Sequence, residues 1–339
     1  MKTSDFDYEL PPERIAQTPV EPRHSSRLLV VHRQDGNLEH STFSKIGDYL
    51  KPGDLLVLNQ TRVIKARIFA RKETGGRVEL FLLNRRNKTR WEALVGGKGL
   101  MAGKRLTLEG GPQVEIKTVL DGSRRLVSFS EPIESYLEAH GHVPLPPYIH
   151  TRLVDPERYQ TVYAHLPGSA AAPTAGLHFT SELIDTLTRQ GIGFAYLTLH
   201  VGLDTFAPVM EEDPSYHRIH SEWCELGSAT AELINRTRKA GGRVVAVGTT
   251  SVRTLESAAL NAQPGKTVAP FSGPTSLFIL PGFSFKAVDA LVTNFHLPRS
   301  TLLMLVSAFV GRERLLAIYQ EAIRLNYRFY SFGDAMLIF

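Results

Sequence analysis

Apolar residues in the C-terminal half of the chain gather in short runs that break off into loops of small or polar residues. The run Val244–Val247 stops at Gly248, where three hydroxyl residues follow and a helical pattern begins. The segment 288–294 is a second apolar run that ends in a polar loop, after which Ser300 and Thr301 mark a helix start. Each segment is predicted to form a strand, a loop and a helix, in that order.

A third segment, Gly168–Phe179, consists mostly of small residues but ends in His178 and Phe179. Thr180 follows and is a suitable cap for a helix predicted over 182–190. Small side chains allow a backbone to approach a ligand closely, and a helix N-terminus offers free N–H groups to an anion. Taken alone, this segment is also compatible with a flexible surface loop.

These three loops are expected to meet at one edge of a sheet. In open α/β sheets, ligands bind outside the carboxyl ends of the strands. Asn, His, Thr and Arg side chains delivered there by separate strands indicate a functional site.

The region before these segments has a different pattern, with short alternating runs separated by Gly-, Asn- and Asp-containing turns. Five or six short strands at this spacing predict a small closed barrel. The runs are 77–83, 90–95, 105–109, 114–120 and 125–129. We therefore predict an α/β protein whose larger domain, 1–60 and 150–339, has an open sheet. The basic β-barrel domain, 61–149, is inserted into it.

Charge is distributed unevenly along the chain. The net charge is +5, yet the segment from Arg62 to Arg125 holds 16 Lys and Arg residues against 6 Asp and Glu. Such a basic module suits a polyanion such as nucleic acid, although a solvated basic surface explains the charge equally well. The candidate nucleic-acid-contacting residues in this segment are Arg62, Arg85, Arg86, Lys88 and Lys98.

Composition limits the class of protein further. The 339 residues, 42% of them hydrophobic, are enough for one large core or two smaller ones. The longest apolar runs, such as 302–310, are too short to span a bilayer, and the chain starts without the apolar core of a signal peptide. The single cysteine, Cys224, excludes an intramolecular disulfide, and its neighbours favour a half-buried strand over a nucleophile. We expect a cytoplasmic protein that does not act at membranes.

Many motifs, spread over almost the whole chain, resemble one known family. They are Asp5–Pro11, Ile15–Pro19, Ser26–Val30, Leu58–Val63, Pro144–Ile149, Tyr159–Ala164, the three loops above, Thr198–Gly202, His220–Glu222 and Tyr327–Ala335. On these residues the chain resembles the S-adenosylmethionine:tRNA ribosyltransferase-isomerase family. It departs from the family pattern at Gln60, usually Asp, at Lys65, usually Pro, and at Asp204, usually Gly.

The resemblance implies a two-domain enzyme of queuosine biosynthesis. Such an enzyme moves and isomerises the ribosyl part of S-adenosylmethionine onto 7-aminomethyl-7-deazaguanine at the tRNA wobble position, and it releases adenine and methionine. S-adenosylmethionine is then a co-substrate, no prosthetic group is required, and the partner is a tRNA with a GUN-type anticodon; a monomer is expected. No GxGxxG motif follows an apolar strand, so a Rossmann-type cofactor site has no support. A tRNA methyltransferase of unusual fold and a non-catalytic RNA-binding protein remain as alternatives.

The reaction requires a base, because a proton must leave the carbon beside the sulfonium. Histidine suits proton transfer near neutral pH, and we rank His178, His200 and His296 in that order, although each could equally be structural. The helix end after His178 and the sulfonium would lower the pKa of its imidazole and keep it neutral. The candidate cofactor-binding residues are Thr174, Ala175, Gly176, Thr249, Thr250, Ser251, Arg253 and Asn294. Arg253 or Arg299 could bind the methionine carboxylate, whereas the hydroxyl residues 249–251 could instead cap a helix.

His217, His220 and Glu222 resemble a metal-ligand set. On a strand, however, His220 and Glu222 would share one face while His217 pointed away. We therefore predict no metal site, and a polar pair of His220 with Glu222 near the site.

Overall fold

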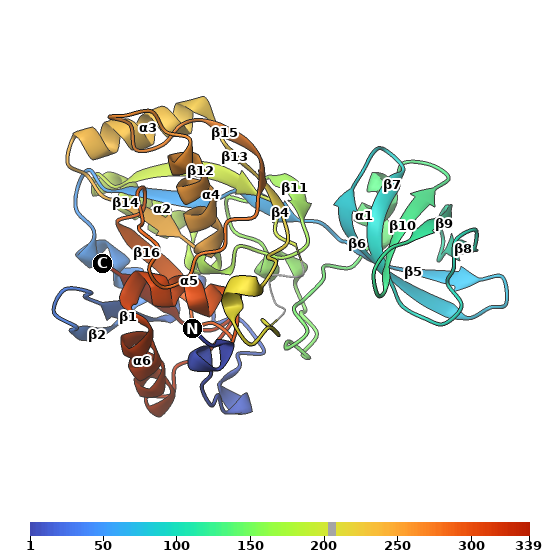
Figure 1. The fold of residues 1–339 in the computed structure, drawn as a ribbon, viewed down its shortest axis with the longest axis horizontal. Helices are drawn as coiled ribbons and strands as arrows, with labels where there is room; N and C mark the ends of the chain where they lie inside the picture. The colour runs from blue at the N-terminus through green and yellow to red at the C-terminus, as the bar shows by residue number, and fades with distance from the viewer. Residues whose placement is uncertain (203–207) are drawn as a thin grey trace. The chain divides into compact units, whose positions relative to one another are not determined.

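A computed structural model describes residues 1–202 and 208–339, so Asp204 lies outside the described residues. The chain forms two compact units (Figure 1). The larger unit comprises Met1–Arg62, Pro147–Leu166 and Ala172–Phe339, and the barrel unit comprises Val63–Pro146 and Pro167–Ala171. The segment 167–171, predicted in the larger domain, therefore groups with the barrel, whereas residues 61–62 and 147–149, predicted in the barrel, group with the larger unit.

The larger unit is built on a nine-stranded sheet with the order β15-β13-β12-β3-β14-β16-β17-β1-β2. The central strands β12, β3, β14 and β16 are parallel, and antiparallel strands flank them. The bounds are β1 Arg27–Val31, β2 Leu38–Thr42, β3 Leu55–Asn59, β12 Gly193–Leu199, β13 Glu222–Leu226, β14 Val244–Val247, β15 Phe271–Thr275, β16 Ala290–Asn294 and β17 Ala335–Ile338. This open mixed sheet confirms the predicted α/β class.

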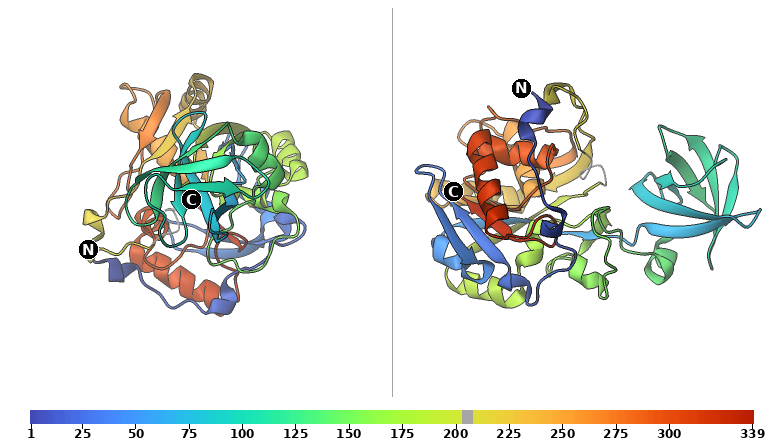
Figure 2. Two further views of the ribbon diagram at one scale, coloured as in Figure 1. Left: turned by 90° about the vertical axis from the view of Figure 1, so that its right-hand side faces the viewer. Right: turned by 90° about the horizontal axis from the view of Figure 1, so that it is seen from below.

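Helices cover both faces of the sheet because the buried central strands are apolar on both sides. One face packs against α3 Ser228–Lys239, α4 Thr249–Leu260, α5 Thr301–Val310 and α6 Arg312–Arg324. The other packs against α2 Ser181–Arg189 and the 3-10 helices η4 Phe43–Tyr49 and η6 Thr174–His178. The right view of Figure 2 shows α2 across the sheet from α5 and α6.

The barrel unit is a closed barrel, as predicted (Figure 2). Its six strands have the order β10-β7-β6-β5-β8-β9. Its strands are β5 Arg67–Lys72, β6 Arg77–Arg85, β7 Arg90–Val95, β8 Arg105–Leu108, β9 Gln113–Val119 and β10 Arg124–Phe129, with the helix α1 Glu134–His140. Inward residues such as Ile68, Leu80 and Ile116 are fully buried, which is the alternation expected of a small barrel. β4 Thr61–Val63 and β11 Leu166–Ser169 form a separate two-stranded sheet.

The helix starts predicted from the sequence occur with one shift. Thr180 caps α2 by accepting from Leu183 N at 3.2 Å, and Ser300 caps α5 in the same way. The helix α4 begins at Thr249, so the hydroxyl residues form its first turn and do not precede it. Gly248 makes the sharp turn from β14 into α4. Its φ of 87° is a backbone conformation that residues with a side chain rarely adopt.

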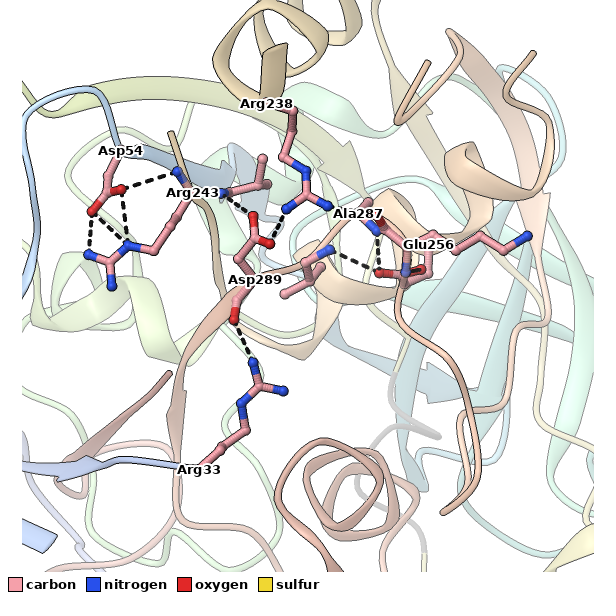
Figure 3. A network of polar contacts seen from close by, with 10 residues as sticks. Arg33, Asp54, Arg238, Arg243, Glu256, Ala287 and Asp289 are labelled. Carbon is pink, nitrogen blue, oxygen red and sulfur yellow. Dashed lines mark hydrogen bonds and ion pairs between the residues drawn. The ribbon is translucent and has the colours of Figure 1, made fainter. Parts of the chain in front are cut away.

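Buried and partly buried carboxylates stabilise the edge of the sheet where the parallel strands begin (Figure 3). Asp54 accepts from Arg243 Nε at 3.1 Å, and Asp289 accepts from Val244 N at 2.7 Å and pairs with Arg238. Glu256 of α4, only 1% exposed, accepts backbone N–H groups of residues 286–288 at 2.9 to 3.1 Å. Burial raises the pKa of Glu256, and the three N–H donors work against that rise. None of the helices in the described part of the chain is long and apolar enough to cross a membrane.

Replacing Glu256 with Ala is expected to lower the free energy of unfolding by about 3 kcal/mol, because it leaves buried N–H groups without a partner. Urea unfolding measures this change. Glu232→Ala, on the exposed face of α3, is the control and should change stability by less than about 0.5 kcal/mol. Equal effects of the two substitutions would contradict a stabilising role for Glu256.

Candidate active site

A pocket lies at the carboxyl edge of the parallel strands, within the larger unit. The loops that follow β14 and β16, the segment around η6 and the residue Val201 after β12 all contribute to it. Its volume is about 60 Å³. The lining residues are Tyr148, Ala172–Ala175, Val201, Gly248–Thr250, Thr293–Leu297, Ser300, Leu302, Tyr330 and Ser331. The predicted convergence of three loops is therefore confirmed.

Five of the eight candidate cofactor-binding residues line this pocket: Thr174, Ala175, Thr249, Thr250 and Asn294. The Thr250 hydroxyl is buried and has no hydrogen-bond partner among the described residues. Asn294 Oδ1 accepts from the Thr174 hydroxyl at 2.9 Å, which holds both side chains at the pocket wall.

The other three candidates lie elsewhere. Ser251 is fully buried inside α4 and donates to Val247 O at 2.8 Å. Gly176 faces away from the pocket, since a Cβ there would lie 2.0 Å from the Tyr163 hydroxyl oxygen. Packing against Tyr163 therefore explains why this residue is small.

Arg253, the third of them, forms a buried ion pair with Glu222. Its Nε also donates to Leu277 O at 3.1 Å, so its guanidinium is already occupied by protein acceptors. Burial acts to raise the pKa of Glu222, but His220 and Arg253 outweigh it and hold that pKa below its usual value. Arg299, at the surface, pairs with Asp7.

The three candidate histidines occupy different depths. His296 lines the pocket, and its Nε2 lies 2.7 Å from the Thr293 hydroxyl. His178 lies one layer behind the wall, where its Nε2 accepts from Asn294 Nδ2 at 3.2 Å and its Nδ1 faces Ser26 Oγ at 2.7 Å. His200 lies outside the pocket and stacks on Trp223.

Burial keeps the two inner histidines uncharged. It lowers the pKa of His296 to about 3. It also lowers the pKa of His178 to about 3, with the charges of Arg328 and Arg23 acting in the same direction. A helix end and a nearby sulfonium were expected to lower the pKa of His178, whereas burial is the main cause. Both imidazoles are neutral hydrogen-bonding groups at pH 7.

Two tyrosines of the wall were not assigned a role from the sequence. The rings of Tyr148 and Tyr330 have centroids 4.8 Å apart, and the Tyr148 hydroxyl lies 2.7 Å from Ser331 Oγ. Tyr330 has a φ of 70°, a left-handed conformation that is uncommon for a bulky residue and often marks a functional site. Both tyrosines belong to motifs that carry the family resemblance, and this was the available signal.

The histidines near Glu222 form polar pairs. His220 Nε2 lies 3.5 Å from Glu222 Oε1, which confirms the predicted pair, and His217 pairs with Glu211 at 2.8 Å. Within residues 1–202 and 208–339, no three His, Cys, Asp or Glu side chains come together as a metal-ligand set. Cys224 is buried on β13, and burial raises the pKa of its thiol to about 11.

Some of the candidate tRNA-contacting residues already form ion pairs with carboxylates of the protein. Arg62, in the larger unit, pairs with Glu157 at 2.5 Å. In the barrel unit, Arg85 pairs with Glu134 and Arg86 with Glu92, whereas the side chains of Lys88 and Lys98 are exposed.

Comparisons with known proteins agree with the resemblance seen in the sequence. A family model described as queuosine biosynthesis protein matches residues 3–338. Relatives named S-adenosylmethionine:tRNA ribosyltransferase-isomerase include those of Symbiobacterium thermophilum and Carboxydothermus hydrogenoformans, each 54% identical over 100% of both chains. A crystal structure of the S-adenosylmethionine tRNA ribosyltransferase from Thermotoga maritima is 41% identical, with a TM-score of 0.58, and covers 99% of this chain and 100% of that one.

The low histidine pKa values predict how stability depends on pH. In the unfolded chain a histidine binds a proton near pH 6.5, but folded His178 and His296 do so only near pH 3. Their contribution to the free energy of unfolding is complete above about pH 6.5. It falls toward pH 3 by about 1.4 kcal/mol per pH unit for each histidine.

Between about pH 6.5 and 4, His178→Asn should therefore reduce the slope of the free energy of unfolding against pH by about 1.4 kcal/mol per pH unit, the contribution of one histidine. Urea unfolding at several pH values measures this slope, with the same substitution at the exposed His165 as the control. An unchanged slope in His178→Asn would mean that this histidine is charged in the folded protein.

Proposed function

The chain belongs to the queuosine biosynthesis protein family, and we propose that the pocket at the carboxyl edge of its large sheet is the active site. The protein is an S-adenosylmethionine:tRNA ribosyltransferase-isomerase, a transferase that uses S-adenosylmethionine as co-substrate and tRNA as substrate. One observation carries the proposed location. Thr250 lines the pocket, and its buried hydroxyl has no partner among the described residues; such a group is costly unless a ligand or water satisfies it.

The reaction sets clear demands on this pocket. Ribosyl transfer to the aminomethyl group of the wobble base releases adenine and methionine, so the site must hold a nucleoside and an amino acid. The hydroxyls of Thr174, Thr249 and Thr250 and the amide of Asn294 suit ribose hydroxyls. The rings of Tyr148 and Tyr330 offer aromatic surface for a purine.

For the methionine carboxylate we propose the N-terminus of α4. The first turn of a helix leaves backbone N–H groups unused, and these bind anions readily. Thr249 and Thr250 form this turn at the pocket wall. Arg253 is a weaker candidate, because Glu222 already neutralises it.

Among the three histidines, we propose His296 as the proton acceptor. It lines the pocket, it is neutral at pH 7, and the Thr293 hydroxyl fixes its ring. We assign His178 a positioning role, because it acts on the pocket only through Asn294. Among the described residues, the side chain of His200 contacts Trp223 and Thr61, and neither of these lines the pocket.

Ligand binding must enlarge the pocket or leave part of the ligand outside it. The pocket's 60 Å³ is far below the volume of about 300 Å³ or more that sites for such ligands occupy. Tyr330 is a candidate for movement, since its left-handed backbone conformation is unfavourable for a side chain of its size.

Three finer properties belong to the same proposal. We propose a GUN-type anticodon, as the family resemblance implies, with the modified base in place of the wobble guanine, and a cytoplasmic location, which is consistent with a tRNA substrate. We also propose that the chain acts as a monomer. Turnover of stem-loop RNAs that differ only in the second and third anticodon positions, together with sedimentation of the active enzyme, tests the first and last of these.

Thr250→Val removes the unpartnered hydroxyl while keeping the side-chain shape. It should weaken S-adenosylmethionine binding by roughly tenfold, the effect of one lost hydrogen bond. Calorimetric titration measures this affinity. Thr254→Val is the matched control, since Thr254 lies one turn later in α4, is buried, and donates to Thr250 O at 3.1 Å. Equal affinities of Thr250→Val and the wild type would remove this hydroxyl from the site.

The basic barrel is proposed to bind the tRNA backbone. Replacing Arg85, Arg86 and Lys88 with Ala should weaken tRNA binding and reduce the slope of log affinity against log salt by up to about 2 to 3. The control is the triple Ala variant of Arg236, Lys239 and Lys266, exposed basic residues of the larger unit. It removes the same charge, so an equal loss in both variants would contradict a specific role for the barrel.

A further inference from the structure

An exposed aromatic pair lies beside the proposed active site. The indole of Trp223 stacks on the imidazole of His200 with ring centroids 5.3 Å apart and planes inclined by 20°. Trp223 is 40% exposed, which is unusual for a side chain that gains so much from burial. The pair is not used by the chemistry proposed above.

Strand pairing fixes this arrangement. The antiparallel register of β12 with β13 places Leu199 opposite Cys224, so the next residue, His200, lies opposite Trp223 and donates its N–H to Trp223 O at 3.0 Å. Cys224 and Glu222 point inward, so Trp223 points outward. The Thr61 hydroxyl, 3.3 Å from His200 Nδ1, holds the imidazole from the side.

The pair adjoins the pocket through the backbone. Val201, the residue after His200, is part of the pocket wall. His200 and Trp223 therefore lie next to a segment of the pocket wall.

We propose that Trp223, supported by His200, is a stacking platform for an unpaired base that flanks the modified wobble nucleotide of the tRNA. This inference rests on the proposed active site. An enzyme that modifies a base must take it out of its stack, so the neighbouring bases lose a stacking partner. Proteins replace such partners with aromatic side chains, and single-stranded loops are recognised mainly in this way.

The charges around the platform favour a base over the phosphate backbone. Glu225, two residues after Trp223, lies on the same exposed face of β13 and repels phosphate. Burial lowers the pKa of His200, against the opposing effect of Glu225, so the imidazole supplies no positive charge near pH 7. The platform presents one ring, which matches one base and is far smaller than a protein–protein interface.

The test uses Trp223→Ala and Trp223→Phe with a stem-loop RNA that carries the modified wobble base. Trp223→Ala should raise the RNA KM roughly tenfold, the scale of one lost stacking contact, and Trp223→Phe should restore most of the loss. The KM for S-adenosylmethionine should stay at the wild-type value. Thr250→Val should show the reverse pattern, so failure of this inference is distinguishable from failure of the proposed site.

Abasic substitutions in the RNA identify the partner base. If the platform binds the base on the 5′ or the 3′ side of the wobble nucleotide, removing that base should raise the wild-type KM as much as Trp223→Ala does. The two changes together should add nothing further. An effect of Trp223→Ala that adds in full to both abasic substitutions would overturn the inference, as would an unchanged RNA KM.

A second measurement keeps Trp223 in place. The chain has two tryptophans, so Trp91→Phe leaves Trp223 as the only indole reporter. RNA binding should quench its fluorescence, and the RNA without the partner base should not. The three RNAs compared are the intact stem-loop and the two abasic ones. Equal quenching with all three, or no quenching with the intact RNA, would contradict stacking.

Discussion

The parallel pairing of β12, β3, β14 and β16 is the constraint on which the larger unit depends. Parallel strands cannot be joined by hairpins, so each is followed by a loop that leaves the same edge of the sheet. Val201, Gly248 and Asn294 are far apart in sequence, yet they follow or end three of these strands and line one pocket. The small-residue helix η6 packs beside β16 and closes the wall from the other face.

The two edges of the sheet have different physical roles. Where the parallel strands begin, Asp54 and Asp289 are paired with arginines and accept backbone N–H groups (Figure 3). Where the strands end, polar groups face a cavity, and the hydroxyl of Thr250 has no partner among the described residues. Satisfied polar groups stabilise a fold, whereas an unsatisfied one at a cavity wall is available to a ligand.

Much of this arrangement could be predicted from the sequence, because strand ends, helix caps and short alternating runs are local patterns. The sequence could not predict how far each side chain lies from the pocket. His178 and His296 both follow apolar residues, but Asn294 separates His178 from the pocket. Arg253 was a candidate carboxylate ligand until Glu222, 31 residues away, was found to pair with it. The close approach of Gly176 to Tyr163 and the left-handed Tyr330 likewise depend on tertiary contacts that no local pattern encodes.

The lining of the pocket carries no Asp, Glu, Lys or Arg among the described residues, and this bears on its co-substrate. S-adenosylmethionine brings a sulfonium cation, and a second positive charge about 4 Å away would cost about 4 kcal/mol at the effective dielectric constant of a protein surface. Burial keeps His296 neutral, and Glu222 and Asp7 pair with the two arginine candidates, Arg253 and Arg299. A neutral base has little proton affinity here, but the proton it would accept lies beside the positive sulfur and is acidified by it. Burial of His296 and the pairing of both arginines thus leave the pocket lining without a positive charge that would oppose the sulfonium.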